Sequence, residues 1–84
     1  MKIPTATFTA TNDGNQKTSI MIRCDHVSAI EELSLRPGAV TDTVGMEWPT
    51  ETRTLLYLVG GRIVGVTEGC WDVVNMVNAA LGAV

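Results

Sequence analysis

Hydrophobic and polar residues alternate along the first part of the chain. Residues 5–11 carry threonine at every odd position and Ala, Phe or Ala at the even positions between them. Strict alternation with many threonines is typical of a strand with one buried face. The run 12–15 consists of turn-forming residues, and 18–24 resumes the alternation as a return strand. The pattern predicts a first β-hairpin whose core-facing side chains include Phe8, Ile20, Ile22 and Cys24.

A second hairpin is predicted in the last third of the chain. Two apolar segments, 54–59 and 62–66, flank Gly60-Gly61, which suits a two-residue turn that needs positive φ. Both faces of the first segment are apolar, so we expect a central strand that is covered on both sides, in part by a neighbouring subunit. Gly65 interrupts the second segment and indicates a bulge or the close approach of another group.

From Cys70 onward the spacing of apolar residues becomes helical. Thr67 is the expected N-cap, Asp72 suits the positive end of the helix, and Gly82 is a natural stop. Trp71 is expected to pack within the fold or in an interface. The predicted apolar stripe consists of Cys70, Val73, Val74, Val77 and Leu81.

The middle of the chain carries two weaker signals. In residues 25–33 the apolar residues have helical spacing, and they alternate poorly with polar ones. We favour an extended segment over a helix because the apolar run is short. Residues 34–53 contain two prolines and two glycines among polar residues, so they predict a long loop with a short strand near residues 40–46. Loops longer than about 12–15 residues are uncommon in compact domains and are often functional.

These elements predict an α+β fold: a small antiparallel β-sheet of four to five strands with one C-terminal α-helix packed on it, formed by residues 1–84 as a single domain. The composition adds an expectation about assembly. The chain is 45% apolar with a mean hydropathy of +0.19, which is rich for 84 residues. Because a small monomer has a high ratio of surface to volume, we expect a homo-oligomer.

Charge narrows the range of partners. The formal net charge is −3, and the six basic residues are scattered along the chain, so nucleic-acid binding is disfavoured. Neither an apolar run of about 20 residues nor the layout of a signal peptide is present, so we expect no membrane partner and a cytoplasmic location. In that compartment both cysteines are expected to be reduced.

One cluster contains the residue types of reactive chemistry. Cys24, Asp25 and His26 are adjacent, and Cys70 is the second cysteine. Structural zinc usually needs four N or S ligands with paired spacing, which these residues do not provide. Cys24 and His26 share a strand face, so a Cys–His nucleophilic pair is the enzymatic alternative. Nothing nearby resembles an oxyanion hole, and we expect no catalysis, no metal and no other cofactor.

The second half of the chain combines a strand ending in Ile-Glu-Glu, a hairpin with a Gly turn, a Val-Thr-Glu step and a Val-rich helix. The first three are found in Val27–Glu32, Thr54–Leu58 with Gly60-Gly61, and Val66-Thr67-Glu68. In this order, over residues 27–81, they resemble the small bacterial FlbD-type flagellar proteins. The chain differs in its longer 34–53 segment, in its added Thr-rich strand, and in Gly69, where the family has serine. The resemblance implies an extended 27–33 segment and an accessory or regulatory role without catalysis.

The leading hypothesis is a regulatory or interaction protein that docks a partner through residues 37–53. Val44, Met46 and Trp48 are apolar within this segment, and tryptophan on a loop suits recognition. The predicted partner-binding residues are Met46 and Trp48, with Glu51 and Arg53 as the polar rim. On this hypothesis Trp48→Ala weakens binding and leaves the thermal midpoint nearly unchanged.

The alternative hypothesis is a small-molecule binder with a pocket between subunits. Arg23 and Arg62, with backbone amides of the loops, would hold an anionic metabolite. Small acidic phage-encoded proteins that capture a molecule or a host protein are the analogy for this class.

Overall fold

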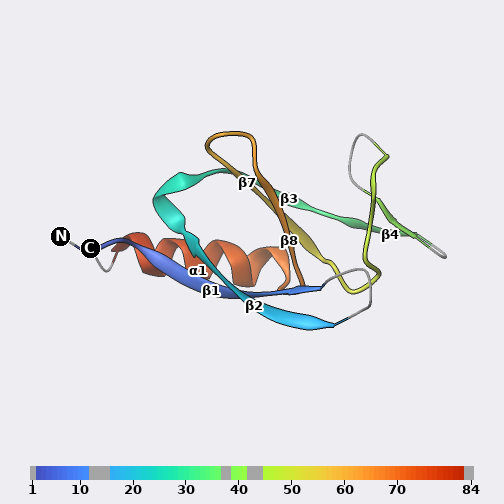
Figure 1. The fold of residues 1–84 in the computed structure, drawn as a ribbon, viewed down its shortest axis with the longest axis horizontal. Coiled ribbons are helices and arrows are strands. Elements are labelled where there is room, and N and C mark those ends of the chain that lie inside the picture. Colours follow the sequence, from blue (N-terminus) through green and yellow to red (C-terminus); the bar gives the residue numbers. More distant parts are fainter. Residues whose placement is uncertain (1, 12–15, 37–38, 42–44, 83–84) are drawn as a thin grey trace.

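The computed structural model of the protein describes residues 2–11, 16–36, 39–41 and 45–82, and describes residues 34–36 and 39–41 by their backbone alone. The chain forms an α+β fold in which antiparallel strands pack with one C-terminal helix (Figure 1). The strands form three small sheets, ordered β1-β2, β3-β7-β8 and β4-β5-β6, in place of one sheet of four to five strands. The elements are β1 (Thr5–Thr11), β2 (Lys17–Arg23), the 3-10 turn η1 (Cys24–His26), β3 (Val27–Glu32), β4 (Ser34–Arg36), β5 (Ala39–Thr41), β6 (Glu47–Trp48), β7 (Thr54–Leu58), β8 (Ile63–Val66) and α1 (Cys70–Gly82).

The β1-β2 hairpin has the buried face that the alternation predicts. The register places Phe8 opposite Ile20. Phe8, Ile22 and Cys24 are buried, whereas Met21 on the other face is exposed. Successive side chains of a strand point to opposite faces, so one register sends the whole apolar set inward. The predicted turn at 12–15 lies outside the described residues.

The β7-β8 hairpin is confirmed, but its loop is longer than the predicted two-residue link. The Leu58 N–H donates to the Arg62 carbonyl at 2.8 Å, and the Gly61 N–H donates to the Leu58 carbonyl at 3.2 Å. Residues 59–61 therefore form a three-residue loop. Gly60 and Gly61 have φ of 97° and 90°, so the predicted positive φ is correct at both glycines.

The ambiguous 25–33 segment is mainly extended, as predicted. After the single turn η1, β3 pairs with β7, and a register shift between Val27 and Ala29 marks an irregularity in the ladder. The Val59 N–H donates to the His26 carbonyl at 2.8 Å, which brings the tip of the second hairpin beside η1. Because β8 pairs with the other side of β7, β7 is the central strand of its sheet, as expected.

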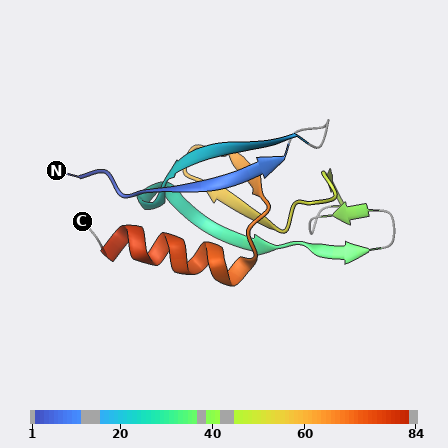
Figure 2. The same ribbon diagram turned by 90° about the horizontal axis from the view of Figure 1, so that it is seen from below.

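The 34–53 segment is more regular than the long loop that its composition predicts. It forms β4, β5 and β6, which pair antiparallel and project beyond the end of α1 at which the helix begins (Figure 2). The expected short strand near 40–46 corresponds in part to β5, and Val44 lies outside the described residues. Prolines and glycines mark the ends of such short strands as well as loops, which explains the difference.

Helix α1 differs from its prediction at both the N-cap and the apolar stripe. It begins at Cys70, and the Val73 N–H donates to the Gly69 carbonyl, so Thr67 is not the N-cap. Val73 and Val77 are buried, and Met76 and Ala80 pack beside them. These four positions follow helical spacing on one face, whereas the predicted Leu81 is 41% exposed. Trp71 is 79% exposed and does not pack within the fold.

Two apolar clusters lie on the two faces of β7. The larger one contains Leu56 and joins the first hairpin, β8 and α1; its buried members are Phe8, Ile22, Cys24, Leu56, Val64, Val66, Val73 and Val77. The smaller one contains Leu33 and Leu55, with Trp48 and Tyr57 packed against it. Leu55 and Leu56 are both fully buried within the single chain. The chain itself therefore covers both faces of β7, and no neighbouring subunit is needed for this burial.

Glu68 connects the two hairpins at the start of the helix. Its carboxylate oxygens accept the Thr9 N–H at 2.9 and 3.0 Å, and its carbonyl accepts the Thr54 hydroxyl at 2.7 Å. The Thr67 N–H donates to the Thr9 carbonyl at 2.7 Å. These bonds place the end of β1 beside the end of β8, which determines one border of the site described next.

Candidate functional site

Trp48 lies over Gly65 on the outer face of the β3-β7-β8 sheet. A Cβ atom at Gly65 would lie 2.9 Å from Trp48 Cε3 and 2.9 Å from Thr52 Cγ2. The absence of a side chain is what allows the indole to approach the strand so closely, as the position of this glycine predicted. Trp48 is half-buried against Leu55, so it is an anchor of the 45–53 segment and not a freely exposed tip.

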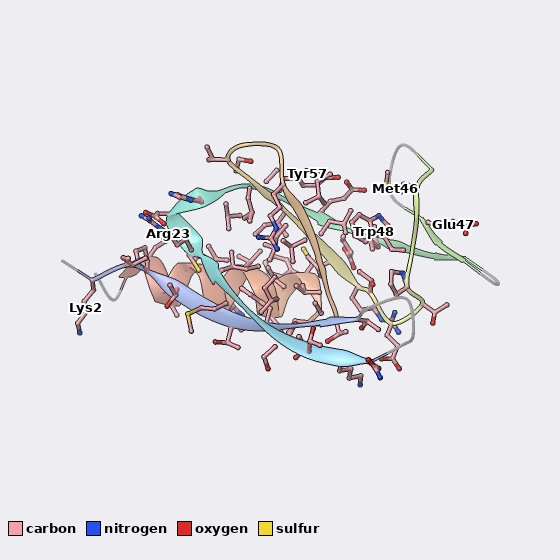
Figure 3. The ribbon with its side chains drawn as sticks, viewed as in Figure 1. Lys2, Arg23, Met46, Glu47, Trp48 and Tyr57 are labelled. Carbon is pink, nitrogen blue, oxygen red and sulfur yellow. The ribbon has the colours of Figure 1, made fainter. Side chains whose placement is uncertain are left out.

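A groove opens beside this tryptophan. Its volume is about 360 Å³, and it runs along β8 between the end of β1 and the segment around β6. Met46 is 56% exposed, and Figure 3 shows it with Glu47 and Trp48 at the opposite end of the molecule from Arg23. The residues that line the groove are Ala10, Thr11, Met46, Glu47, Trp48, Pro49, Thr52, Arg62, Ile63, Val64 and Gly65.

The walls of the groove combine apolar surface with a few polar groups. Glu47 and Arg62 are exposed and provide one charge of each sign. Thr11 Oγ1 is a buried atom that has no hydrogen-bond partner among the residues that the structure describes. A bound molecule would therefore find both apolar surface and polar groups along these walls.

Glu51 and Arg53, the two predicted rim residues, make their side-chain interactions outside the groove. Glu51 pairs with Lys17 at 3.5 Å, and both side chains are exposed. The Arg53 guanidinium donates to the Thr50 carbonyl at 2.9 Å and so holds the turn before β7. Of the four predicted partner-binding residues, Met46 and Trp48 line the groove and Glu51 and Arg53 do not.

The two arginines of the alternative hypothesis border one cavity within a single chain. This second cavity has a volume of about 180 Å³, and His26 lies with Arg23 and Arg62 in its lining. The remaining lining residues are Ile20, Met21, Ile22, Leu58 and Val64. The bond from the hairpin tip to the His26 carbonyl brings Arg62 close to Arg23, although the two arginines are far apart in the sequence.

Arg23 is partly neutralised by its neighbour. Its Nη2 and Nε atoms donate to the two carboxylate oxygens of Asp25 at 2.7 and 3.1 Å. This hydrogen-bonded pairing raises the pKa of Arg23 and lowers the pKa of the Asp25 carboxyl. Arg62 forms no ion pair within the described part of the chain, so it is the cation of this cavity that remains available to an anion.

The Cys24 thiol is poorly suited to nucleophilic chemistry. Its side chain is buried, and its Sγ lies 3.8 Å from the Ile22 carbonyl. Burial, with a further contribution from the Asp25 charge, raises the pKa of Cys24. Reactive cysteines are partly exposed and have a lowered pKa, so these features disfavour a thiolate at this position. Among the described residues, no three His, Cys, Asp or Glu side chains come together as a metal site.

Several groove residues were not singled out by the sequence, and Ile63 and Thr11 are the two that matter most for the geometry of the groove. Both belong to strand patterns that read as ordinary scaffold, and their position beside Trp48 depends on how the two hairpins meet. Gly65 was the available signal, because a glycine within a strand indicates close approach.

Comparison with protein-family models, with curated proteins and with solved structures found no match to this chain. In the part of the chain that the structure describes, no helix is long and apolar enough to cross a membrane. The two cavities are therefore the features of the molecule that bear on function.

Proposed function

We propose that the protein is a non-enzymatic interaction protein that binds a segment of a partner protein in the groove beside Trp48. The observation that carries this proposal is the joint position of Met46 and Trp48 on the wall of a 360 Å³ cavity. Trp48 is held by its packing on Gly65, whereas Met46 is largely exposed. A rigid aromatic residue beside an adaptable methionine is a common arrangement for protein recognition.

The groups around the groove suit binding better than catalysis. Its described polar side chains are Thr11, Glu47, Thr52 and Arg62. This set lacks an imidazole or thiol that could act with the single carboxylate in proton transfer or nucleophilic attack. A regulatory role, as the FlbD-type resemblance implies, would operate through occupancy of the groove by a partner.

Self-association is part of the proposal, because large apolar side chains are exposed away from the groove. Trp71, Met21 and Val59 are 79%, 69% and 68% exposed. Exposed apolar groups of this size are a frequent feature of subunit contacts. Light scattering at micromolar protein concentration checks this point: we expect a homo-oligomer, and a monomeric mass at all concentrations contradicts it.

The test of the proposed function uses random octapeptides displayed on phage as the probe. We expect enrichment of peptides whose affinity falls about tenfold or more in Met46→Ala, because truncation of a central apolar contact typically costs more than 1 kcal/mol. Ile3→Ala is the matched control, since this apolar side chain is equally exposed, at 56%, but lines neither the groove nor the second cavity. It should leave affinity within about twofold, and both variants should keep the thermal midpoint. If no peptide is enriched, or if the two variants weaken binding equally, the groove is not the site.

A second candidate function is the binding of a small anion in the cavity lined by Arg23, His26 and Arg62. The observation in its favour is the convergence of two arginines and an imidazole on 180 Å³ of partly apolar space. Inorganic phosphate is the probe, with amide chemical shifts in NMR as the readout. Saturable shifts at the hairpin tip that disappear in Arg62→Gln would support this function, whereas identical responses of both proteins would contradict it.

A further inference from the structure

The free edge of β8 faces the groove. In the ladder with β7, the Leu58 N–H bonds the Arg62 carbonyl, and residues Leu56 and Val64 form a register pair two positions further along. Hydrogen-bonded pairs alternate along antiparallel strands, so Arg62, Val64 and Val66 direct their backbone groups toward β7. Ile63 and Gly65 must then direct their N–H and C=O groups away from β7. Both residues line the groove.

The described part of the chain provides no strand that pairs with this edge. β8 is an outer strand of the β3-β7-β8 sheet. The next outward-facing N–H along the same edge, that of Thr67, donates to the Thr9 carbonyl at 2.7 Å. β1 therefore approaches the edge at one end only. The space that opens between Thr11 and the β6 segment is the groove, and Ile63 and Gly65 are among its lining residues.

We propose that the occupant of the groove is an extended segment of a partner protein that pairs with the free edge of β8 and adds a fourth strand to the β3-β7-β8 sheet. This inference rests on the proposed function and names the conformation of the bound segment. The outward N–H and C=O groups of Ile63 and Gly65 are two residues apart along β8. This spacing matches the backbone groups of an extended strand and does not match those of a helix. Strand addition to an exposed edge supplies such a segment with main-chain bonds, and adjacent pockets select its side chains.

The walls of the groove indicate what such a strand would carry. On one side it would meet Trp48, Met46 and the 40% exposed Ile63, which suit an apolar side chain. On the other side it would meet Thr11, whose buried hydroxyl has no partner among the described residues. Since alternate side chains of a strand point to opposite sides, we expect a segment with an apolar residue followed by a polar one, and without proline at the pairing positions.

Amide hydrogen exchange measured by NMR on the whole protein tests the pairing directly. The probes are the enriched octapeptides. In the free protein the amides of Ile63 and Gly65 should exchange faster than that of Val64, which bonds β7. Bound peptide should slow exchange at Ile63 and Gly65 by about tenfold or more and leave Val64 nearly unchanged.

Two sets of variants separate main-chain pairing from side-chain contact. Ile63→Pro removes the outward N–H without removing a bond to β7, and should weaken peptide binding about tenfold or more. Ile63→Val keeps the N–H, and its affinity for the peptide should stay within about twofold of that of the parent protein. If Ile63→Pro does not fold, N-methylation of the peptide gives the same information on the unchanged protein. Methylation at alternate positions should abolish binding only where the peptide N–H faces β8.

The possible outcomes distinguish this inference from the function on which it rests. Peptides that depend on Met46 but leave exchange at Ile63 and Gly65 unchanged would overturn strand pairing and retain the groove as the site. Failure to enrich any peptide would overturn the proposed function and, with it, the inference. Slowed exchange at the two amides that depends on protein concentration alone would identify a second copy of this chain as the occupant, and would overturn the assignment to a partner protein.

Discussion

A side chain at Gly65 should displace Trp48 from the sheet, although β propensity alone would favour the change. The backbone of Gly65 is that of a strand and does not have positive φ, so alanine and valine are both allowed conformationally. A Cβ atom, however, would lie 2.9 Å from Trp48 Cε3, 3.1 Å from Trp48 Cζ3 and 2.9 Å from Thr52 Cγ2. Contacts below 3 Å require the neighbouring groups to move.

Two opposing effects determine how much Gly65→Ala changes the free energy of unfolding. Overpacking of a filled site typically costs about 1–3 kcal/mol. Replacing glycine by alanine within a strand returns about 0.5–1 kcal/mol, because the unfolded chain loses conformational freedom. The difference spans about 0–2.5 kcal/mol, so we expect Gly65→Ala to lower the free energy of unfolding by roughly 1 kcal/mol. Each 1 kcal/mol lowers the midpoint by about 4–8 °C in a domain of this size. Gly65→Val should be worse, although valine is a strong strand former.

Urea denaturation followed by far-UV circular dichroism provides the measurement, because this signal comes mainly from the backbone and, unlike tryptophan fluorescence, depends little on the surroundings of Trp48. The control is the background Trp48→Ala/Thr52→Ser, which removes the atoms that the new Cβ would meet. In that background Gly65→Ala should be neutral or stabilising by up to about 1 kcal/mol.

The stability order of the Gly65 variants decides between packing and propensity. If both variants are as stable as the parent protein, or if Val is the most stable residue at this position, the indole does not occupy the surface of β8. If the loss is the same in both backgrounds, the strain comes from elsewhere and the contact with Trp48 does not cause it.

Three further predictions concern bonds and titratable groups outside the groove. Glu68→Ala should lower the free energy of unfolding by about 1.5–3 kcal/mol, because the Thr9 N–H loses a charged acceptor. Glu68→Gln should lower it less, because the amide oxygen still accepts this hydrogen bond, and equal losses for the two variants in chemical denaturation would contradict this explanation. In thiol labelling of the native protein, Cys70 should react at least about tenfold faster than Cys24, because the Cys24 thiol is buried and its pKa is raised. Fast labelling of Cys24 near neutral pH would instead support the Cys–His nucleophilic pair. The hydrogen-bonded pairing with Arg23 lowers the folded-state pKa of the Asp25 carboxyl. Any stability that this pair contributes is therefore present above the pKa of the carboxyl in the unfolded chain, and it is lost as the pH falls through the lower pKa of the folded state. NMR titration should show the low pKa of Asp25 and its rise in Arg23→Gln, and no rise would refute the pairing.

Trp48 shows how the structure changes a prediction about one residue. A tryptophan in a segment rich in proline and glycine reads as an exposed recognition group. Its packing against Leu55 and Gly65 means that Trp48→Ala should lower stability as well as affinity. The better probe of the groove is therefore Met46, whose exposed side chain makes truncation inexpensive to the fold.

The candidate site could be predicted only in part, because its residues come from three separate segments. Met46 and Trp48 were identifiable as apolar residues in a segment of turn-forming composition. Glu51 and Arg53 are close to them in the chain, yet the turn before β7 directs both side chains elsewhere. Ile63 was not identifiable, since nothing in the pattern of β8 indicates which of its edges stays unpaired.

The sequence by itself determined the local elements. Thr–Ala and Thr–Phe alternation, the Gly60-Gly61 loop and the valine spacing after Cys70 each act within a few residues, through side-chain direction and backbone sterics. Only the tertiary structure decided which surfaces meet. The Thr9–Thr67 bond and the seating of Trp48 on Gly65 join residues more than fifteen positions apart, and together they leave the edge of β8 open to the groove. Such contacts depend on the packing of whole hairpins, and no local pattern encodes them.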